Sequence, residues 1–443
     1  MDGLRVIKRA SPLVLNIYGE QMYVCGCNYI KSRFVVNLSI KNSCLYYSCL
    51  TGELLEILNM ELALPYLISH WFLVGDEINE IDNVSKLQHL MRVIGSNTPI
   101  GYTNFDILTT TKCNANCFYC YEKGYEKVSM TEETAKEIVK FIVDNHRNNA
   151  VTIRWFGGEP LVNNNVIDVI SLGLKKNNIQ LTSTIVSNGW LFSEEIIEKA
   201  VKIWNLRQAT ITIDGTEDVY NKIKSYPNAK FNAYKLVMKN IELLLQSGIY
   251  VTIRVNIERH NILIIKDLLD ELCKSYNDKN VKFFISPLNN TMLNSSIEST
   301  DGDRKNILEE IFQTQESLFK LGYEVVTPGL KRLEPYYCKA EDVNYILIKP
   351  NGHIAYCPDN FERKSYGNVN DKYHTICKSR FQKIKNIKGA ICDDCPLFAA
   401  CNPNDHCPAS RYLPCDTKRK EFSLKNLELA IKMEYKKYIT SII

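Results

Sequence analysis

Hydrophobic and polar positions along the middle of the chain follow a pattern typical of strand–helix repeats. Six short runs rich in β-branched residues predict strands, and amphipathic stretches between them predict helices. One such helix is expected after Thr131, a predicted N-cap. The predicted strands are FDILTT (105–110), VTIRWF (151–156), TSTIVS (182–187), ATITID (209–214), VTIRVNI (251–257) and VKFFIS (281–286). This pattern predicts an α/β domain over residues 100–330, with a parallel sheet that is curled or doubly wound.

The first 99 residues have a different pattern and predict a small α+β module. Three strands are expected in QMYVCGCNY, SRFVVNLS and CLYYSC, and three helices in LTGELLEILN, MELALPYLISHWF and VSKLQHLMRVIG. From residue 331 to 418 helices become rare while Cys, Pro and Gly increase, which indicates a region organised by metal. Residues 419–443 predict a closing helix whose apolar face carries Leu424, Leu427, Ile431, Tyr435 and Tyr438.

Composition and charge narrow the class of protein. The 443 residues carry a formal net charge of +4, which is too balanced to indicate nucleic acid or an anionic membrane surface as a partner. The N-terminus has no evident secretory signal and the apolar stretches are too short for a membrane span, so we expect a cytoplasmic protein. Sixteen cysteines in such a chain indicate metal binding more than structural disulfides.

Unusual residues follow five predicted strands at their carboxyl ends, where functional residues of strand–helix repeats gather. They are the cysteine triplet Cys113, Cys117 and Cys120, then Gly157–Pro160, Ser187–Gly189, Asp214–Gly215, and Arg254 with Asn256. Three thiolates on one loop can hold three corners of an iron–sulfur cube and leave the fourth iron open. The alternative for the triplet is a zinc site, but zinc prefers four ligands, and the sequence near the triplet has no fourth Cys or His.

The segment TKCNANCFYC resembles the signature of the radical S-adenosylmethionine (radical SAM) family, including the aromatic Tyr119 before the last cysteine. This resemblance implies a partial (β/α)6 barrel and a [4Fe–4S] cluster held by Cys113, Cys117 and Cys120. It also implies that S-adenosylmethionine chelates the open iron and is cleaved to a 5′-deoxyadenosyl radical that abstracts hydrogen from a substrate carbon. A flavodoxin- or ferredoxin-type protein would supply the electron.

Other residues would bind S-adenosylmethionine by the same resemblance. Gly157, Gly158, Glu159 and Pro160 resemble the motif that contacts the methionine amino group, where glycine lets the backbone approach closely. Glu159 would complement that positive charge or brace the loop. Ser187 and Asn188 offer polar partners, and Arg254 suits a carboxylate, although each of these residue types is also common in structural roles.

The cysteines after residue 331 resemble the SPASM extension, which carries two auxiliary [4Fe–4S] clusters in peptide- and protein-modifying radical SAM enzymes. The outer cluster would be held by Cys392, Cys395, Cys401 and Cys415, and the inner one by Cys338, Cys357 and Cys407. The spacing before Cys407 is longer than in the family. Where some relatives supply an eighth cysteine this chain has Asn344, which predicts an open inner iron unless Cys377 completes it. Zinc-ribbon-like sites are the alternative for these cysteines.

The remaining cysteines, Cys25, Cys27, Cys44, Cys49 and Cys273, lie in apolar contexts and are expected to pack in cores. Metal binding by Cys25 with Cys27 and Cys44 with Cys49 is the alternative. The first 99 residues are similar in pattern to the winged-helix modules that bind leader peptides by adding a strand to a sheet edge, or they form a simple cap. The resemblance therefore predicts a maturase of a ribosomally made precursor peptide that installs a crosslink, and a Cys thioether is the expected bond.

Other functions stay open. Carbon–carbon or carbon–oxygen crosslinking and epimerisation would use the same residues. An anaerobic sulfatase-maturating enzyme is a second enzyme class; there an aspartate directly follows the inner-cluster cysteine, whereas here Pro358 intervenes and Asp359 is a weak candidate base. An iron–sulfur electron carrier is the alternative without radical chemistry.

Overall fold

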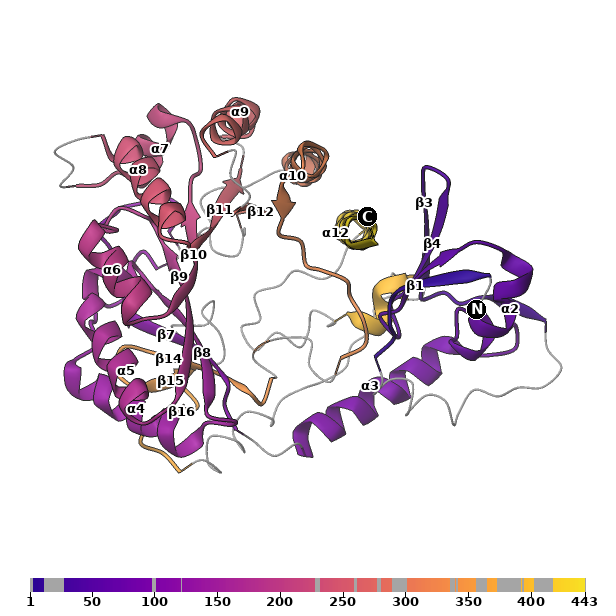
Figure 1. Ribbon diagram of the computed structural model, residues 1–443, viewed down its shortest axis with the longest axis horizontal. Coiled ribbons are helices and arrows are strands. Elements are labelled where there is room, and N and C mark those ends of the chain that lie inside the picture. The colour runs from indigo at the N-terminus through magenta and orange to yellow at the C-terminus, as the bar shows by residue number, and fades with distance from the viewer. Residues whose placement is uncertain are drawn as a thin grey trace. The chain divides into compact units, whose positions relative to one another are not determined.

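The computed structural model of the chain (Figure 1) describes most of its 443 residues. The described residues are 3–11, 28–97, 101–120, 122–227, 232–258, 261–276, 280–288, 301–334, 339, 342–355, 365–372, 392, 394–401 and 417–442. Contacts divide the chain into two compact units that do not follow sequence order. The barrel unit comprises Pro99–Val326 and Lys339–Ile384, and the terminal unit comprises Met1–Thr98, Thr327–Cys338 and Lys385–Ile443. The domain boundaries expected from sequence stay a prediction.

The barrel unit is built on six parallel strands that are adjacent in the order of the chain. They are β7 (Asn104–Thr110), β8 (Ala150–Gly157), β9 (Gln180–Ser187), β10 (Leu206–Thr212), β11 (Tyr250–Ile257) and β12 (Val281–Pro287). Each predicted strand is confirmed, although β10 ends two residues before the predicted Asp214. Their register is parallel throughout, as in the pairing of Ile253 with Ile211 and Phe283. The predicted α/β fold is therefore confirmed.

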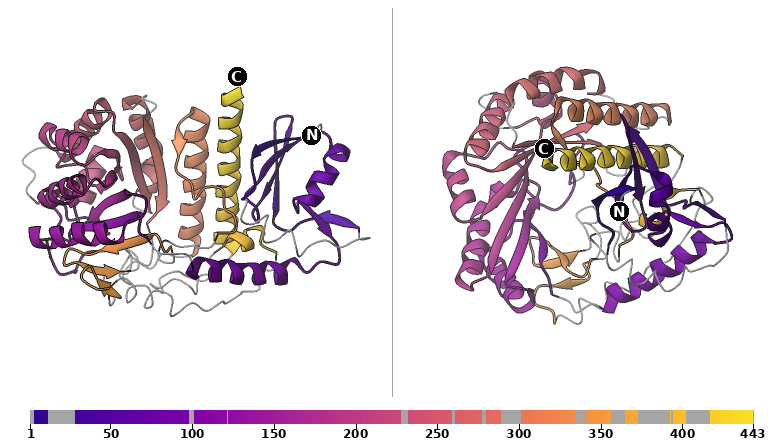
Figure 2. Two further views of the ribbon diagram at one scale, coloured as in Figure 1. Left: turned by 60° about the horizontal axis from the view of Figure 1, so that its bottom comes forward. Right: turned by 45° about the vertical axis from the view of Figure 1, so that its right-hand side comes forward.

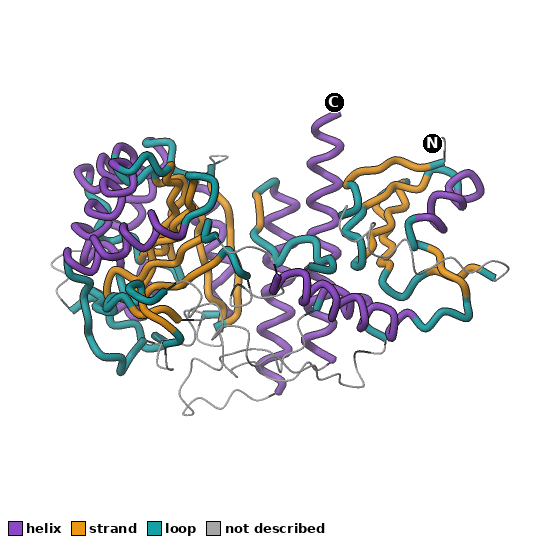
Figure 3. Tube along the Cα trace, turned by 90° about the horizontal axis from the view of Figure 1, so that it is seen from below, coloured by secondary structure: helices purple, strands orange, loops and turns teal. Residues whose placement is uncertain are grey.

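Helices lie along the convex side of this curved sheet (Figures 1 and 3). They are α4 (Glu132–Asn145), α5 (Asn164–Lys176), α6 (Glu194–Lys202), α7 (Glu217–Lys224), α8 (Ala233–Gln246), α9 (Ile265–Ser275) and α10 (Asp301–Leu321). The predicted cap of α4 is confirmed, because the Thr131 side chain accepts a hydrogen bond from the Thr134 backbone N–H. Since one face of each strand packs on these helices, the opposite, concave face is left for polar side chains.

The sheet continues beyond the six repeats at both edges. At one edge β13 (Glu324–Val325) pairs in parallel with β12. At the other edge β14 (Tyr345–Ile348) pairs in parallel with β7, and β15 (His353–Ala355) and β16 (Gly367–Asn368) follow antiparallel. Part of the cysteine-rich C-terminal region thus extends the barrel sheet directly.

The terminal unit contains a four-stranded antiparallel sheet in the order β1-β5-β4-β3. Its strands are β1 (Leu4–Lys8), β3 (Val35–Ile40), β4 (Ser43–Ser48) and β5 (Leu54–Ile57), and β2 (Tyr29–Lys31) pairs separately with β6 (Leu73–Gly75). The helices α2 (Met60–Ser69) and α3 (Glu80–Asn97) follow. The strands expected in SRFVVNLS and CLYYSC are confirmed, whereas most of QMYVCGCNY lies outside the described residues. The winged-helix likeness stays a prediction.

The helix expected in LTGELLEILN is wrong, because this segment forms β5 at the centre of the sheet. Leu54 packs into one apolar cluster and Leu55 into another on the opposite face. A strand buried on both faces has a continuous apolar run, and periodicity alone cannot distinguish such a run from a short buried helix. The buried Glu56 in this strand accepts hydrogen bonds from Ser43 and Arg5.

The closing helix is confirmed as α12 (Thr417–Ile442), a single long helix visible in Figure 2. Its predicted apolar face packs into the terminal unit: Leu427 and Ile431 are buried in the core, and Leu424 and Tyr435 pack against it. Tyr435 also joins this helix to β4 and β5 through hydrogen bonds with Ser43 and Glu56. Among the described residues, no helix is long and apolar enough to cross a membrane.

Candidate functional site

The cysteine triplet lies on the loop that follows β7, and a returning segment closes the base of this loop. Thr111 donates its backbone N–H to Val128 O (2.8 Å), and its hydroxyl accepts the Val128 N–H (2.7 Å). Below it, the Met130 N–H bonds Thr109 O (2.9 Å). Both ends of the loop are therefore joined by hydrogen bonds beside the carboxyl end of β7, where the sequence predicted the cysteines to lie.

The three thiols are accessible to differing degrees. Cys113 is exposed, and Cys117 and Cys120 are half-buried. Partial burial raises the pKa of the Cys113 thiol to about 12 and also raises the pKa values of Cys117 and Cys120. The thiols are thus protonated at neutral pH in the absence of metal, and metal binding would release protons.

Gly157 and Gly158 at the end of β8 hold the start of the cysteine loop. The Gly158 N–H donates to Thr110 O (3.0 Å), and the Glu159 N–H donates to Lys112 O (2.9 Å). An added Cβ would lie 2.2 Å from Thr110 O at Gly157 and 2.5 Å from Lys112 O at Gly158. Gly157 also has φ of +131°. The two glycines therefore allow close backbone approach, and that approach is to the cysteine loop itself.

The Glu159 carboxylate braces the loop after β9. It is fully buried, and it accepts hydrogen bonds from the Ser187 hydroxyl (2.9 Å), the Asn188 N–H (2.7 Å) and the Leu161 N–H (3.2 Å). Burial raises the pKa of Glu159 to about 7, and these hydrogen bonds oppose the rise. Of the two roles expected for Glu159, these contacts support the bracing role.

Asn188 connects this braced loop to the cysteine loop. Its side-chain amide donates to Asn114 Oδ1 (2.7 Å) and lies 3.9 Å from the Cys113 sulfur. Its Oδ1 accepts the Trp190 N–H (3.0 Å), which fixes the orientation of the amide. The structure thus brings Gly157, Gly158, Glu159, Ser187 and Asn188 together around the first cysteine, as expected from their positions after neighbouring strands.

Tyr119 is held by a buried pair, Asp214 and Lys224, of which the sequence predicted only Asp214 at a strand end. Its phenol donates to Asp214 Oδ2, and Lys224 Nζ lies 3.0 Å from the phenol oxygen and 3.2 Å from Asp214 Oδ2. Burial alone would lower the pKa of Lys224, but its negative partners raise it well above the ordinary value. A lysine in the last turn of a helix usually complements the helix dipole, so its sequence position carried no indication of this contact.

Arg254 and Asn256 lie on one face of β11. Since Ile253 and Val255 are buried among apolar residues, the alternation along the strand places Arg254 on the concave face. Arg254 donates to Asn256 Oδ1 (2.9 Å) and lies 5.3 Å from the Phe284 ring centroid. The guanidinium is thus oriented by a polar and an aromatic neighbour.

Most cysteines predicted to hold the auxiliary clusters lie outside the described residues. Cys338, Cys357, Cys377, Cys407, Cys415 and the candidate base Asp359 lie outside the described residues, as do Cys25 and Cys27. Cys392 and Cys395 share a tight turn closed by the Cys395 N–H on Cys392 O (3.1 Å), and the turn leads through Pro396–Ala400 to the exposed Cys401. Asn344 donates its amide to Asp342 Oδ1 (3.2 Å).

Cys49 confirms the expected packing of an isolated cysteine. It is fully buried in the apolar cluster of the terminal unit, and Cys392 and Cys395 pack against the same cluster. Burial raises the pKa of the Cys49 thiol above its usual range, and the neighbouring Cys395 raises it further. Cys44 and Cys273 are half-buried in β4 and α9.

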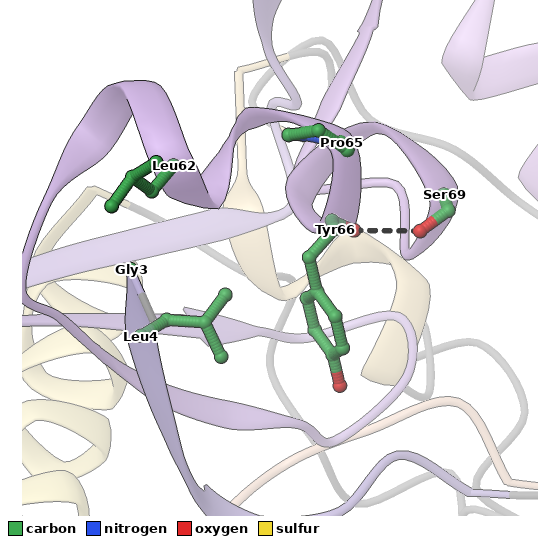
Figure 4. A pocket seen from close by; sticks show the side chains of 6 residues that line it. All are labelled: Gly3, Leu4, Leu62, Pro65, Tyr66 and Ser69. Atoms are coloured by element: carbon green, nitrogen blue, oxygen red, sulfur yellow. Dashed lines mark hydrogen bonds between the residues drawn. The ribbon is translucent and has the colours of Figure 1, made fainter. Parts of the chain in front are cut away.

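A pocket of about 350 Å³ lies between β1 and α2 in the terminal unit (Figure 4). Its lining is mainly apolar and includes Leu4, Leu62, Pro65 and the Tyr66 ring. The helix beside it exposes Met60, Leu62 and Leu64 to solvent. Met60 and Leu64 lie one turn apart on one face of α2, whereas Leu62 points to the other side and lines the pocket.

Residues 107–272 match the model of the Radical SAM superfamily. The chain carries a radical SAM domain. Enzymes of this superfamily use S-adenosylmethionine and a [4Fe–4S] cluster, and the match spans the cysteine triplet together with the Gly157–Pro160 and Ser187–Asn188 loops.

Relatives in sequence are distant. The chain is 25% identical over 290 residues to an uncharacterised protein of Methanocaldococcus jannaschii, covering 65% of this chain and 94% of that protein. It is 22% identical over 327 residues to the radical SAM cyclopropyl synthase TigE of Paramaledivibacter caminithermalis, covering 67% of this chain and 66% of TigE. The chain is thus related to radical SAM enzymes along about two thirds of its length.

Solved structures of two radical SAM enzymes share the fold. The structure of SuiB of Streptococcus suis bound to precursor peptide SuiA has a TM-score of 0.53 at 13% identity and covers 88% of this chain and 99% of that chain. The structure of anSMEcpe with bound AdoMet and Cp18Cys peptide has a TM-score of 0.56 at 16% identity and covers 76% and 99%. These likenesses show the architecture alone.

The donor set at the cysteine loop fits the cluster that the family implies. Among the described residues, no three His, Cys, Asp or Glu side chains converge as ligands of one metal ion would. Three thiols on one loop are instead the donors used by iron–sulfur clusters, in which each thiolate binds a separate iron. The residues present therefore suit a cube better than a single zinc ion.

Proposed function

We propose that this chain is a radical SAM peptide maturase that installs a crosslink in a ribosomally made precursor peptide, with a Cys thioether as the bond formed. The observation that carries the proposal is the clamping of the cysteine loop onto the neighbouring strand ends by Gly158, Glu159 and Asn188. A simple electron carrier has no need of these polar contacts beside its cluster.

In this proposal Cys113, Cys117 and Cys120 hold the [4Fe–4S] cluster, and S-adenosylmethionine binds at the adjoining strand ends. When bound, the cluster and cofactor supply a 5′-deoxyadenosyl radical that removes a hydrogen atom from a substrate carbon. The protein's residues position these groups: Glu159 fixes the Ser187–Asn188 loop, and Arg254 offers a guanidinium to a carboxylate. Tyr119 and Pro160 would line the same cofactor site.

Two features of the terminal unit support the proposal that the substrate is a peptide. Its pocket beside Tyr66 and the exposed apolar residues of α2 suit the apolar side chains of a leader segment. Among the described residues β1 pairs with β5 alone, which leaves its other edge, next to this pocket, for a peptide strand to join. SuiB, which shares the fold over most of the chain, was solved with its precursor peptide. A leader peptide is thus our proposed partner, with a flavodoxin- or ferredoxin-type reductant in the cytoplasm.

The proposed thioether rests on the count of auxiliary cysteines. Seven cysteines would give four ligands to the outer auxiliary cluster and three to the inner one. The amide of Asn344, which stands where some relatives have an eighth cysteine, is directed to Asp342. A substrate thiolate, or alternatively Cys377, would complete the inner cluster, and Asp359 remains the candidate base.

The test is reaction of the reduced, reconstituted protein with S-adenosylmethionine and a Cys-containing precursor peptide encoded beside its gene. We expect the product to lose two hydrogens and its cysteine to resist alkylation. A product that has lost two hydrogens but still alkylates would replace the thioether by a carbon–carbon or carbon–oxygen crosslink. A product of unchanged mass in H2O that gains one deuterium at an α-carbon in D2O would indicate epimerisation.

An anaerobic sulfatase-maturating enzyme is the second candidate, and the shared fold with anSMEcpe favours it. That activity predicts oxidation of a sulfatase-derived peptide with no crosslink and no need for residues 1–97. Leu62→Asp at the pocket of the terminal unit should lower processing of a leader-bearing precursor, whereas a short sulfatase peptide should react as it does with the wild-type protein. The two candidates therefore differ in a single comparison of substrates.

A further inference from the structure

Lys224 is buried to a degree that is rare for lysine. Its side chain is 4% exposed and that of its partner Asp214 is 1% exposed. Lysine is almost never fully buried unless it is paired, because removing the ammonium from water is costly. Both residues of this buried pair contact Tyr119 of the cysteine loop, so the pair has a role beyond ending the helix α7.

Lys224 contacts the cysteine loop on both sides of Cys117. Its backbone carbonyl accepts the N–H of Asn116 (2.9 Å), one residue before that cysteine. Its ammonium contacts the hydroxyl of Tyr119, two residues after the cysteine, at 3.0 Å. The ammonium also lies 5.6 Å from the centroid of the Tyr119 ring. One residue thus fixes the loop through its main chain and its side chain.

Asp214 anchors this contact to the barrel. Its Oδ1 accepts the backbone N–H of Asn256 (2.9 Å) and the Asn256 side-chain amide (3.1 Å). Its backbone carbonyl accepts the side-chain amide of Asn261 (2.8 Å). Because β11 fixes Asp214 in this way, the position of Lys224, and through it the cysteine loop, is set by the sheet.

The two charges of the pair, one positive and one negative, both lie against Tyr119, two residues after Cys117. In a buried setting such charges are weakly screened, and their effect on a nearby electron acceptor is larger than at the surface. A positive charge favours addition of an electron to a cluster and a negative charge opposes it, which is one means by which proteins set cluster potentials.

We propose that Lys224 is a positioning residue of the cysteine loop, and that its charge, balanced by Asp214, sets the reduction potential of the cluster held by Cys113, Cys117 and Cys120. This inference rests on the proposed function of the triplet. It assigns to the pair a role distinct from fold stability, because stability alone has no reason to respond in opposite directions to loss of the two charges.

The test is a redox titration of the reconstituted full-length protein without S-adenosylmethionine, followed by electron paramagnetic resonance. The signal absent from a Cys113→Ala/Cys117→Ala/Cys120→Ala variant identifies the cluster in question. We expect Lys224→Met to shift its midpoint to more negative potential and Asp214→Asn to shift it to more positive potential. Lys224→Arg, which keeps the charge, should restore the wild-type midpoint.

The matched control is Lys202→Met, which removes an exposed lysine paired with Glu198 on α6 and should leave the midpoint unchanged. If Lys224→Met does not fold, Asp214→Asn against Asp214→Glu decides, since only the first removes the charge. Equal midpoints in variants with full iron content, or shifts of the same sign, would overturn the inference. Absence of a triplet-dependent signal in the wild-type protein would instead contradict the proposed function itself.

Discussion

The two cysteine regions of this molecule are held in different ways. The loop from Cys113 to Cys120 is fixed by polar contacts: backbone hydrogen bonds from Gly158 and Glu159, and the buried pair of Asp214 and Lys224. The turn at Cys392–Cys395 is instead packed against an apolar cluster that includes Cys49 and Phe398. The first arrangement specifies direction and charge, as reaction chemistry requires, whereas the second mainly specifies burial.

The difference teaches where each region is vulnerable. Apolar packing depends on volume, so deletion of a buried ring removes support in proportion to the cavity left behind. Polar clamping depends on a few atoms, so a small change at one of them displaces the loop with little loss of buried area. Substitutions in the apolar cluster and substitutions at the polar contacts of the cysteine loop should therefore have separable effects.

The largest effect is expected for Phe398→Ala in the terminal unit. Phe398 is buried in the cluster that Cys392 and Cys395 contact, and removing its ring should cost about 3–5 kcal/mol of stability. Hydrogen exchange should speed up in α3 and α12, while iron bound at the Cys113 loop stays constant. Leu62→Ala, at an exposed position of the same unit, is the control and should have little effect. Loss of the iron bound at Cys113, Cys117 and Cys120 in Phe398→Ala would show that the two cysteine regions are not supported independently.

Gly158→Ala should weaken the polar clamp, by which we mean the contacts of Gly158, Glu159, Asp214 and Lys224 that fix the cysteine loop. Its added Cβ would lie 2.5 Å from Lys112 O, so the cysteine loop must move, at a cost of about 2 kcal/mol or more. We expect triplet iron, measured by the cluster's absorbance, to fall sharply. Gly248→Ala is the control for a glycine substitution away from the loop: Gly248 has a positive φ, which Gly158 lacks, and nothing lies within 4 Å of an added Cβ. Equal losses of triplet iron from both substitutions would mean that general destabilisation, and not the contact with Lys112, explains the result.

The strands of the barrel unit, the strand β5 and the residue Lys224 differ in how far the sequence could predict them. The six strands and the strand-end residues were predicted because alternating apolar runs and strand ends have a regular period. β5 was not, since its two buried faces hide that period. Lys224 was missed because its role depends on a contact with Tyr119, which lies 105 positions away in the chain. Local pattern thus predicts the frame, and long-range polar contacts complete the site.

Glu159 makes the stability of the barrel unit depend on pH. Its folded-state pKa is raised from 4.5 to about 7, so between these values the folded protein holds more protons than the unfolded chain. Stability should therefore fall as pH rises through this range, by on the order of 1 kcal/mol per pH unit. In Glu159→Gln this slope should vanish in urea unfolding measured from pH 4.5 to 7. A slope that persists would show that another group is responsible.

Tyr119→Phe should give the smallest effect, about 1 kcal/mol, because it removes one phenol while the Asp214–Lys224 pair remains. Thermal unfolding of the apo-protein measures it. Tyr250→Phe, at an exposed position on the same sheet, should be silent. If Tyr119→Phe lowers thermal stability no more than Tyr250→Phe does, the Tyr119 phenol does not help to fix the cysteine loop.

The central claim is that Cys113, Cys117 and Cys120 support radical chemistry with S-adenosylmethionine. Its most direct test measures 5′-deoxyadenosine after reduction of the reconstituted protein, in the wild type and in the variant with all three cysteines replaced by alanine. We predict multiple turnovers or a full single turnover in the wild type and none in the variant, whose auxiliary cysteines are intact. Formation of 5′-deoxyadenosine at equal rates in both proteins, or in neither, would contradict the account.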